Sequence, residues 1–104
     1  GGGEEVYEDL VAYPPAVQDL AVVLDAAVPA DDVLALVRKA GGKLLRGAAV
    51  FDVYEGDQVP PGKRSLAMRL TLRASDRTLS EKDINGVRAK VLAALERDLG
   101  AALR

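Results

Sequence analysis

The chain has 104 residues and a formal net charge of −2, and it contains neither cysteine nor histidine. Its length fits one domain, which at this size buries roughly two-thirds of its unfolded surface and needs no disulfide or metal ion to fold. The missing residue types exclude disulfides, thiolate metal ligands and a histidine general base. No apolar run approaches the roughly 20 residues that span a bilayer, so we expect a soluble, cytoplasmic protein with no membrane partner.

The charges are unevenly distributed along the chain. Residues 1–35 contain eight acids and no base, whereas residues 63–77 contain five bases and one acid. The net charge argues against tight binding of nucleic acid, but an acidic chain can still present a locally basic strand. Two interpretations stay open: these bases are solubilising charges, or they belong to a binding surface.

The chain begins with an expected linker followed by a strand. We interpret residues 1–12 as a linker, with Gly1–Gly3 as added residues, and residues 13–104 as the domain. Two prolines at 14–15 break any local helix and favour an extended backbone. The apolar, β-branched run AVQDLAVVL over 16–24 then predicts the first strand.

A helix and a second strand come next. Residues 29–40 have a proline and two aspartates at one end and two basic residues at the other, which matches both ends of a helix dipole. Two glycines at 41–42 supply the stop signal. The second strand is expected over 44–54, and it is long enough to carry a bend or bulge near Gly47.

A loop rich in glycine and proline, residues 55–62, leads into a third strand over 63–73. Apolar and polar residues alternate in this part of the chain. The apolar set is expected to face the core: Phe51, Val53, Leu66, Met68, Leu70 and Leu72. The polar and small set is expected on the opposite face: Asp52, Tyr54, Ser65, Ala67, Arg69, Thr71 and Arg73.

A long helix is predicted near the end of the chain. Ser80 suits the N-cap, with Asp83 in a capping-box position, and apolar residues recur in steps of three and four over 84–99. Gly100 ends the helix, and residues 101–104 could pair as an edge strand. The resulting order predicts an α+β fold, a ferredoxin-like βαββαβ sandwich with a four-stranded antiparallel sheet and two helices on one face.

A sheet covered on one side explains the alternation and leaves a polar face open. The residues predict binding rather than catalysis, because triad and thiol chemistry are missing. The glycines at 41–43 follow a helix instead of preceding one, and Asp31 with Asp32 is interpreted as a partner of the helix dipole. No spacing of carboxylates suggests a metal site, so we expect no enzyme activity in this domain.

Aromatic, arginine and small polar residues on an open sheet are typical of single-stranded RNA binding, in which bases stack on flat side chains. Structural alternatives stay open: Tyr54 could pack at the sheet edge, and Arg69 could form an ion pair with Asp52. A different class of function is also possible, namely a protein-interaction or regulatory module that self-associates through the open sheet. That reading predicts a more apolar face.

Three segments of the chain, YPPAVQDLAVVLD, FDVYEGDQVPPGKRSLAMRLTLRASDRTLSEKDI and the closing amphipathic helix, resemble a known family. The family is the ferredoxin-fold anticodon-binding domain at the C-terminus of bacterial phenylalanyl-tRNA synthetase beta subunits. The resemblance covers residues 13–104, and its most specific runs are FDVY at 51–54, GKRSLAMRL at 62–70 and DRTLS at 76–80. One departure is Gln18, where many members have arginine.

The resemblance implies a tRNA-binding module of an aminoacyl-tRNA synthetase, a phenylalanine–tRNA ligase. The domain would bind the anticodon stem-loop of tRNA-Phe and help position the tRNA for ATP-dependent charging elsewhere. ATP and magnesium would act at the distant catalytic site, so no cofactor is expected in this domain. The implied partners are the tRNA, the rest of the beta subunit and the alpha subunit, and the isolated domain is expected to be a monomer.

The resemblance also assigns candidate RNA contacts. It places the RNA surface on seven residues, here called the open-face set: Asp19, Ala21, Asp52, Tyr54, Ser65, Ala67 and Arg69. It implies phosphate contacts from Lys63 and Arg64, and Arg77 could also touch RNA. The DRTL run is interpreted as mainly structural, because Asp76 and Thr78 can bond local backbone before the helix cap.

Overall fold

The computed structural model describes residues 12–104, so the predicted linker lies, apart from Ala12, outside the described residues. Within this range the elements follow the predicted βαββαβ order. They are β1 (Ala16–Asp25), α1 (Ala30–Gly41), β2 (Leu45–Tyr54), β3 (Lys63–Leu72), α2 (Glu81–Leu99) and β4 (Ala102–Leu103). The possible edge strand after Gly100 is therefore present as β4, which pairs with β1.

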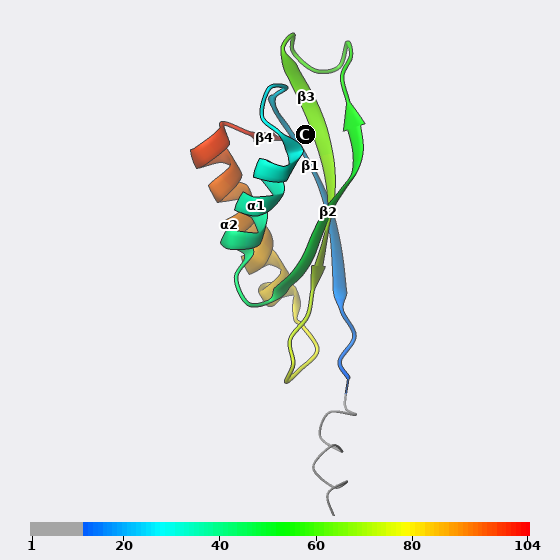
Figure 1. The fold of residues 1–104 in the computed structure, drawn as a ribbon. Helices are drawn as coiled ribbons and strands as arrows, with labels where there is room; N and C mark the ends of the chain where they lie inside the picture. The colour runs from blue at the N-terminus through cyan, green and yellow to red at the C-terminus, as the bar shows by residue number, and fades with distance from the viewer. Residues whose placement is uncertain (1–11) are drawn as a thin grey trace, which may run out of the picture.

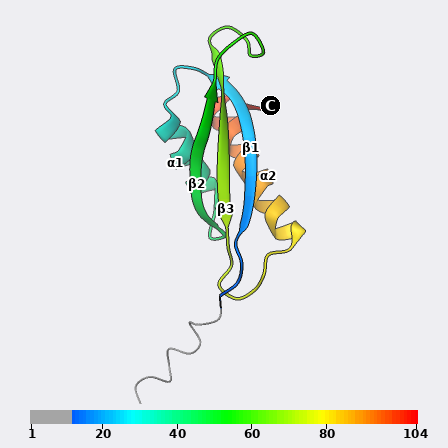
Figure 2. The same ribbon diagram turned by 90° about the vertical axis from the view of Figure 1, so that its right-hand side faces the viewer.

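The four strands form one antiparallel sheet in the order β2-β3-β1-β4. Both helices pack on the same face of the sheet (Figure 1), and the opposite face is uncovered (Figure 2). This arrangement confirms the predicted ferredoxin-like fold. Neither helix within residues 12–104 has the length and apolar character needed to cross a membrane.

The core lies between the sheet and the two helices. The strands contribute alternate side chains to it, as expected for a sheet covered on one side: Leu20, Val22, Leu24, Leu66, Met68, Leu70 and Leu72. The helices contribute side chains at helical spacing: Val33, Val37, Val87, Val91 and Leu95. Burial of these apolar surfaces holds α1 and α2 on one face and leaves the other side chains of β1 and β3 on the uncovered face.

The predicted start of α2 is confirmed in detail. The Ser80 hydroxyl accepts a hydrogen bond from the Asp83 N–H, and the Asp83 carboxylate accepts one from the Ser80 N–H, which completes a capping box. Gly100 ends the helix in the left-handed conformation at a φ of 62°; its N–H bonds to the carbonyl of Glu96, and the next N–H, that of Ala101, bonds to the carbonyl of Leu95. Residues other than glycine rarely adopt this backbone conformation.

Strand β2 departs from simple alternation at two β-bulges. One lies between Leu45 and Gly47, as predicted, and the second lies between Val50 and Asp52. The second bulge inserts Phe51 as an extra residue and turns it to the uncovered face, where 52% of it is exposed. The prediction that Phe51 faces the core is therefore wrong.

Val53 was also predicted in the core. It does lie opposite the buried Leu66, but it is 50% exposed. It stands near the end of β2, where the β2–β3 hairpin extends beyond α1 (Figure 1). The alternation therefore gives its side of the sheet correctly, whereas its burial depends on how far the helix reaches.

Candidate nucleic-acid interface

The open-face set lies together on the uncovered face, as its alternation predicts. The strand register aligns three rows across β1, β3 and β2: Val23, Ser65 and Tyr54; then Ala21, Ala67 and Asp52; then Asp19, Arg69 and Ala49. All seven members of the set fall within these rows, and only Ser65 among them is buried. Their roles in RNA binding stay predictions.

Arg69 lies at the centre of the third row and has two partners. Its Nε and Nη2 each donate to the Asp19 carboxylate at 2.9 Å, and its Cζ lies 4.7 Å from the centroid of the Phe51 ring. The hydrogen bond from Arg69 lowers the pKa of Asp19, and the same contact raises the pKa of Arg69. The predicted ion pair with Asp52 is wrong, because the register places Asp19 opposite Arg69 and Asp52 opposite Ala67.

A second arginine–aromatic pair lies on the same face. The Cζ of Arg104 is 5.0 Å from the centroid of the Tyr54 ring, and Arg104 Nη2 donates to Gln58 Oε1 at 3.0 Å. The backbone N–H of Arg104 donates to the carbonyl of Ala21 at 2.8 Å, which continues the pairing of β4 with β1. Tyr54 is half-buried and belongs to the face, although β2 is an edge strand.

Small side chains separate the two arginine–aromatic pairs. Ala21 and Ala67 are directly opposite each other, between the row of Tyr54 and the row of Arg69. Residues of this size let a planar ligand approach the sheet, and the arginine and aromatic planes on either side offer surfaces for stacking. The face is therefore chemically suited to unpaired bases.

Sequence reasoning missed two residues of this face, Phe51 and Arg104. Nothing in the alternating FDVY run signals the bulge that turns Phe51 outward. Arg104 could have been found, because a strand pairing over 101–104 places its last residue beside Ala21. Using that signal, however, requires knowing the register of a very short edge strand, Ala102–Leu103.

The three predicted contacts outside the open-face set are separated in the structure. Lys63 begins β3 opposite the exposed Asp25 and lies at the hairpin end of the uncovered face. Arg64 lies on the helix-facing side opposite Leu24, where its Nη2 donates to the carbonyl of Val28 at 2.7 Å. Its Nε is buried without a hydrogen-bond partner among the described residues, so this guanidinium points into the protein rather than towards a phosphate.

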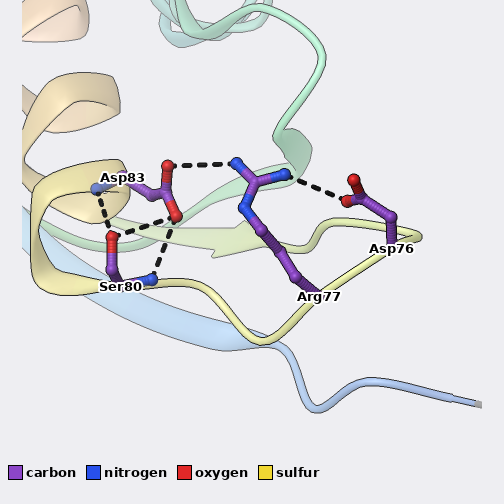
Figure 3. A network of polar contacts seen from close by, with 4 residues as sticks. All are labelled: Asp76, Arg77, Ser80 and Asp83. Carbon is purple, nitrogen blue, oxygen red and sulfur yellow. Dashed lines mark hydrogen bonds and ion pairs between the residues drawn. The ribbon is translucent and has the colours of Figure 1, made fainter.

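Arg77 lies beyond the other end of β3, in the loop before α2. Its Nη1 bonds to Asp76 at 3.0 Å and its Nη2 to Asp83 at 3.1 Å, next to the Ser80 cap (Figure 3). Asp76 thus bonds a side chain, not the local backbone that was predicted. The hydrogen bond from Arg77, followed by that from the Ser80 N–H, lowers the pKa of Asp83 to about 2.

Gln18, the departure from the family pattern, lies opposite Leu70 on the helix-facing side of β1. Its Nε2 donates to the carbonyl of Val17 at 3.2 Å. The side chain at this position is on the opposite side of the sheet from Asp19 and Ala21. Glutamine in place of the family's arginine therefore does not remove a positive charge from the uncovered face.

Comparison with known proteins gives a consistent match. The family model described as "Ferredoxin-fold anticodon binding domain" matches residues 12–104. The phenylalanine–tRNA ligase beta subunit of Moorella thermoacetica is 48% identical over 98 residues, which cover 94% of this chain and 12% of that protein. The same subunit of Thermobifida fusca is 49% identical over 92 residues, covering 88% of this chain and 11% of that protein.

A third relative is more distant in sequence. The phenylalanine–tRNA ligase beta subunit of Porphyromonas gingivalis is 44% identical over 96 residues, 92% of this chain and 12% of that protein. The chain thus spans only 11–12% of the length of these three relatives. With a family match over all of its described residues and the expected fold, the chain belongs to the ferredoxin-fold anticodon-binding domain family.

Proposed function

We propose that this chain is the anticodon-binding domain of a phenylalanine–tRNA ligase beta subunit and that its uncovered sheet face binds the anticodon stem-loop of tRNA-Phe. The observation that carries the proposal is the gathering of the open-face set in three rows, with an arginine–aromatic pair on either side of Ala21 and Ala67. The relatives, which are beta subunits of this ligase, support it.

Each kind of side chain on this face has a part in the proposed contact. Unpaired loop bases stack on the aromatic and guanidinium planes, while the alanines admit them close to the backbone. Asp52 is exposed and accepts hydrogen bonds from base edges, and Lys63 meets a phosphate at the hairpin end of the face. The chain binds and orients the tRNA without taking part in bond formation.

The charging reaction belongs to other parts of the proposed enzyme. ATP and magnesium act at a catalytic site outside this domain, which leaves tRNA positioning as the domain's contribution. Its protein partners are then the rest of the beta subunit and the alpha subunit.

The binding is expected to be weak and salt-dependent, with a Kd on the order of 10⁻⁴–10⁻⁶ M, typical of contacts dominated by phosphates. The chain is acidic overall, and the guanidinium groups of Arg69 and Arg77 are already paired with carboxylates. Titration of the domain with the tRNA-Phe anticodon stem-loop at several salt concentrations tests this expectation. Nanomolar binding that does not change with salt would contradict it.

Chemical-shift mapping of the same titration tests the location. The proposal expects the largest shifts at the open-face set and at Lys63. A stem-loop of the same length with a changed anticodon is the matched control and should bind less tightly. Shifts confined to α1 and α2 would show that RNA binds the wrong side of the molecule for this proposal.

A further inference from the structure

We propose that Phe51, Arg69 and Asp19 form a rigid stacking platform, on which one unpaired base of the bound RNA lies against the free face of the Arg69 guanidinium. The contact we infer is a stacking contact and not a phosphate contact, so it adds affinity without adding salt dependence. The inference rests on the proposed function and assigns a specific task to a residue, Phe51, that sequence patterns place in the core.

The platform is held by two independent contacts. The Asp19 carboxylate receives two hydrogen bonds of 2.9 Å from Nε and Nη2 of Arg69, which fixes the plane of the guanidinium. The Phe51 ring lies under the same group, 4.7 Å from Cζ to the ring centroid. Because the three residues come from β1, β3 and β2, the sheet itself positions the platform.

The bulge in β2 is what makes Phe51 available. In a regular strand Phe51 would share the side of Val53, which lies opposite Leu66 and faces the helices, so the ring would point away from Arg69. The register shift between Val50 and Asp52 instead brings Phe51 to the side of Arg69, where the ring is half exposed and contributes little to the core. Bulges of this kind are often found where a side chain is re-aimed next to a functional site.

The charge balance of the platform decides which part of a nucleotide it can bind. Asp19 neutralises Arg69, so the pair has no net charge to offer a phosphate. Arg69 nevertheless keeps 53% of its side chain exposed, and Phe51 covers only one side of the guanidinium. A flat, weakly hydrated surface of this type stacks on a nucleobase.

The test compares affinity with salt dependence in the intact chain. Phe51→Leu removes the ring and keeps apolar bulk, and Arg69→Lys keeps the charge beside Asp19 but removes the plane. Each change is expected to weaken stem-loop binding by about fivefold to a hundredfold, the range measured for loss of one stacked base. The slope of log Kd against log salt concentration should stay at the wild-type value, because no phosphate contact is lost.

Two further variants calibrate the measurement. Arg97→Lys is the matched control, since Arg97 on α2 forms a similar exposed ion pair, with Nε 2.9 Å from Asp98 Oδ1, and lies on a helix. It should bind like the wild type. Lys63→Ala removes the proposed phosphate contact and should reduce the slope by about 1.

A measurement on the wild-type chain guards against variants that fail to fold. On RNA addition, the Arg69 side-chain protons are expected to shift upfield, because they come to lie over the face of a base. Wild-type binding through the open face without this shift, or with a Phe51→Leu affinity equal to wild type, overturns the platform and leaves the proposed function standing. A reduced slope in Arg69→Lys also overturns it, whereas an absence of any saturable binding overturns both proposals.

Discussion

Asp83 connects the start of α2 to the loop before it, and its protonation state should affect stability. Its carboxylate accepts hydrogen bonds from Arg77, from the Ser80 N–H and from the Ser80 hydroxyl (Figure 3). The pKa of Asp83 in the folded chain is about 2, below the ordinary value of 3.8. A depressed pKa favours the folded state above about pH 4, and this contribution is lost as the pH falls towards 2.

We therefore predict that Asp83→Asn reduces the loss of stability between about pH 4 and pH 2, because the folded state no longer has to protonate this group. Urea unfolding at a series of pH values measures the effect. Asp57→Asn, in the exposed loop between β2 and β3, is the control and should follow the wild-type curve. Identical acid dependence in Asp83→Asn and the wild type would show that the Arg77–Asp83–Ser80 contacts do not stabilise the fold.

At the same scale, residue pairs differ in how well sequence predicts them. The Ser80–Asp83 capping box was predicted because the two residues are three positions apart and helix geometry alone brings them together. The partner of Arg69 was predicted wrongly because Asp19 is 50 positions away. Choosing between Asp19 and Asp52 requires the register of two strand pairs, and alternation gives the face but not the register.

At the scale of whole elements, an arginine from each helix bonds the backbone of a nearby sheet edge. Arg38 on α1 donates to the carbonyl of Ala48 on β2, and Arg88 on α2 donates to the carbonyl of Asp19 on β1, both at 3.3 Å. The Asp19 carbonyl is beyond the reach of β4, which pairs with β1 at Val22 and Val23. Unpaired edge groups are templates for association with another chain, and basic side chains reduce that tendency.

We predict that the double variant Arg38→Ala/Arg88→Ala self-associates more than the wild type, because both edges lose their covering side chains. Light scattering over a range of protein concentrations measures the change in mass. The control is Arg97→Ala, which removes an exposed arginine whose hydrogen bonds within residues 12–104 go to its neighbour Asp98, and this variant should leave the mass unchanged. An unchanged mass in the double variant would show that the short β4 and the strand ends already protect the edges.

The elements themselves were largely predictable, because each has local signals such as a cap, a glycine stop or an apolar period. The bulge at Phe51 was not, since the run FDVY alternates regularly and so places Phe51 on the side of Val53. Its cause is the pairing of β2 with β3, which local sequence does not describe. Phe51 was therefore not predicted on the uncovered face because its position depends on pairing between strands.

At the scale of the whole molecule, the uncovered face must remain accessible if it binds RNA. A second copy packed on this face would have to bury the exposed Asp19–Arg69 pair together with Asp52, and the desolvation of such charges can exceed what their pairing returns. The half-exposed Val17 and Phe51 are small apolar areas beside these charges and do not make the face a typical dimer interface. We predict that the isolated chain is a monomer at the concentrations used for RNA titration.

Sedimentation equilibrium with and without the stem-loop measures this prediction and separates the two functional classes. A monomer that forms a complex of one chain with one stem-loop agrees with the anticodon-binding proposal. A stable dimer that dissociates on Arg69→Glu, and whose mass does not change when RNA is added, would instead favour a module that self-associates through the sheet. Arg69→Glu is informative because it places a second carboxylate opposite Asp19, and this negative charge repels both a partner copy and a phosphate. In the absence of RNA, however, the substitution changes the measured mass only if the wild-type chain is a dimer.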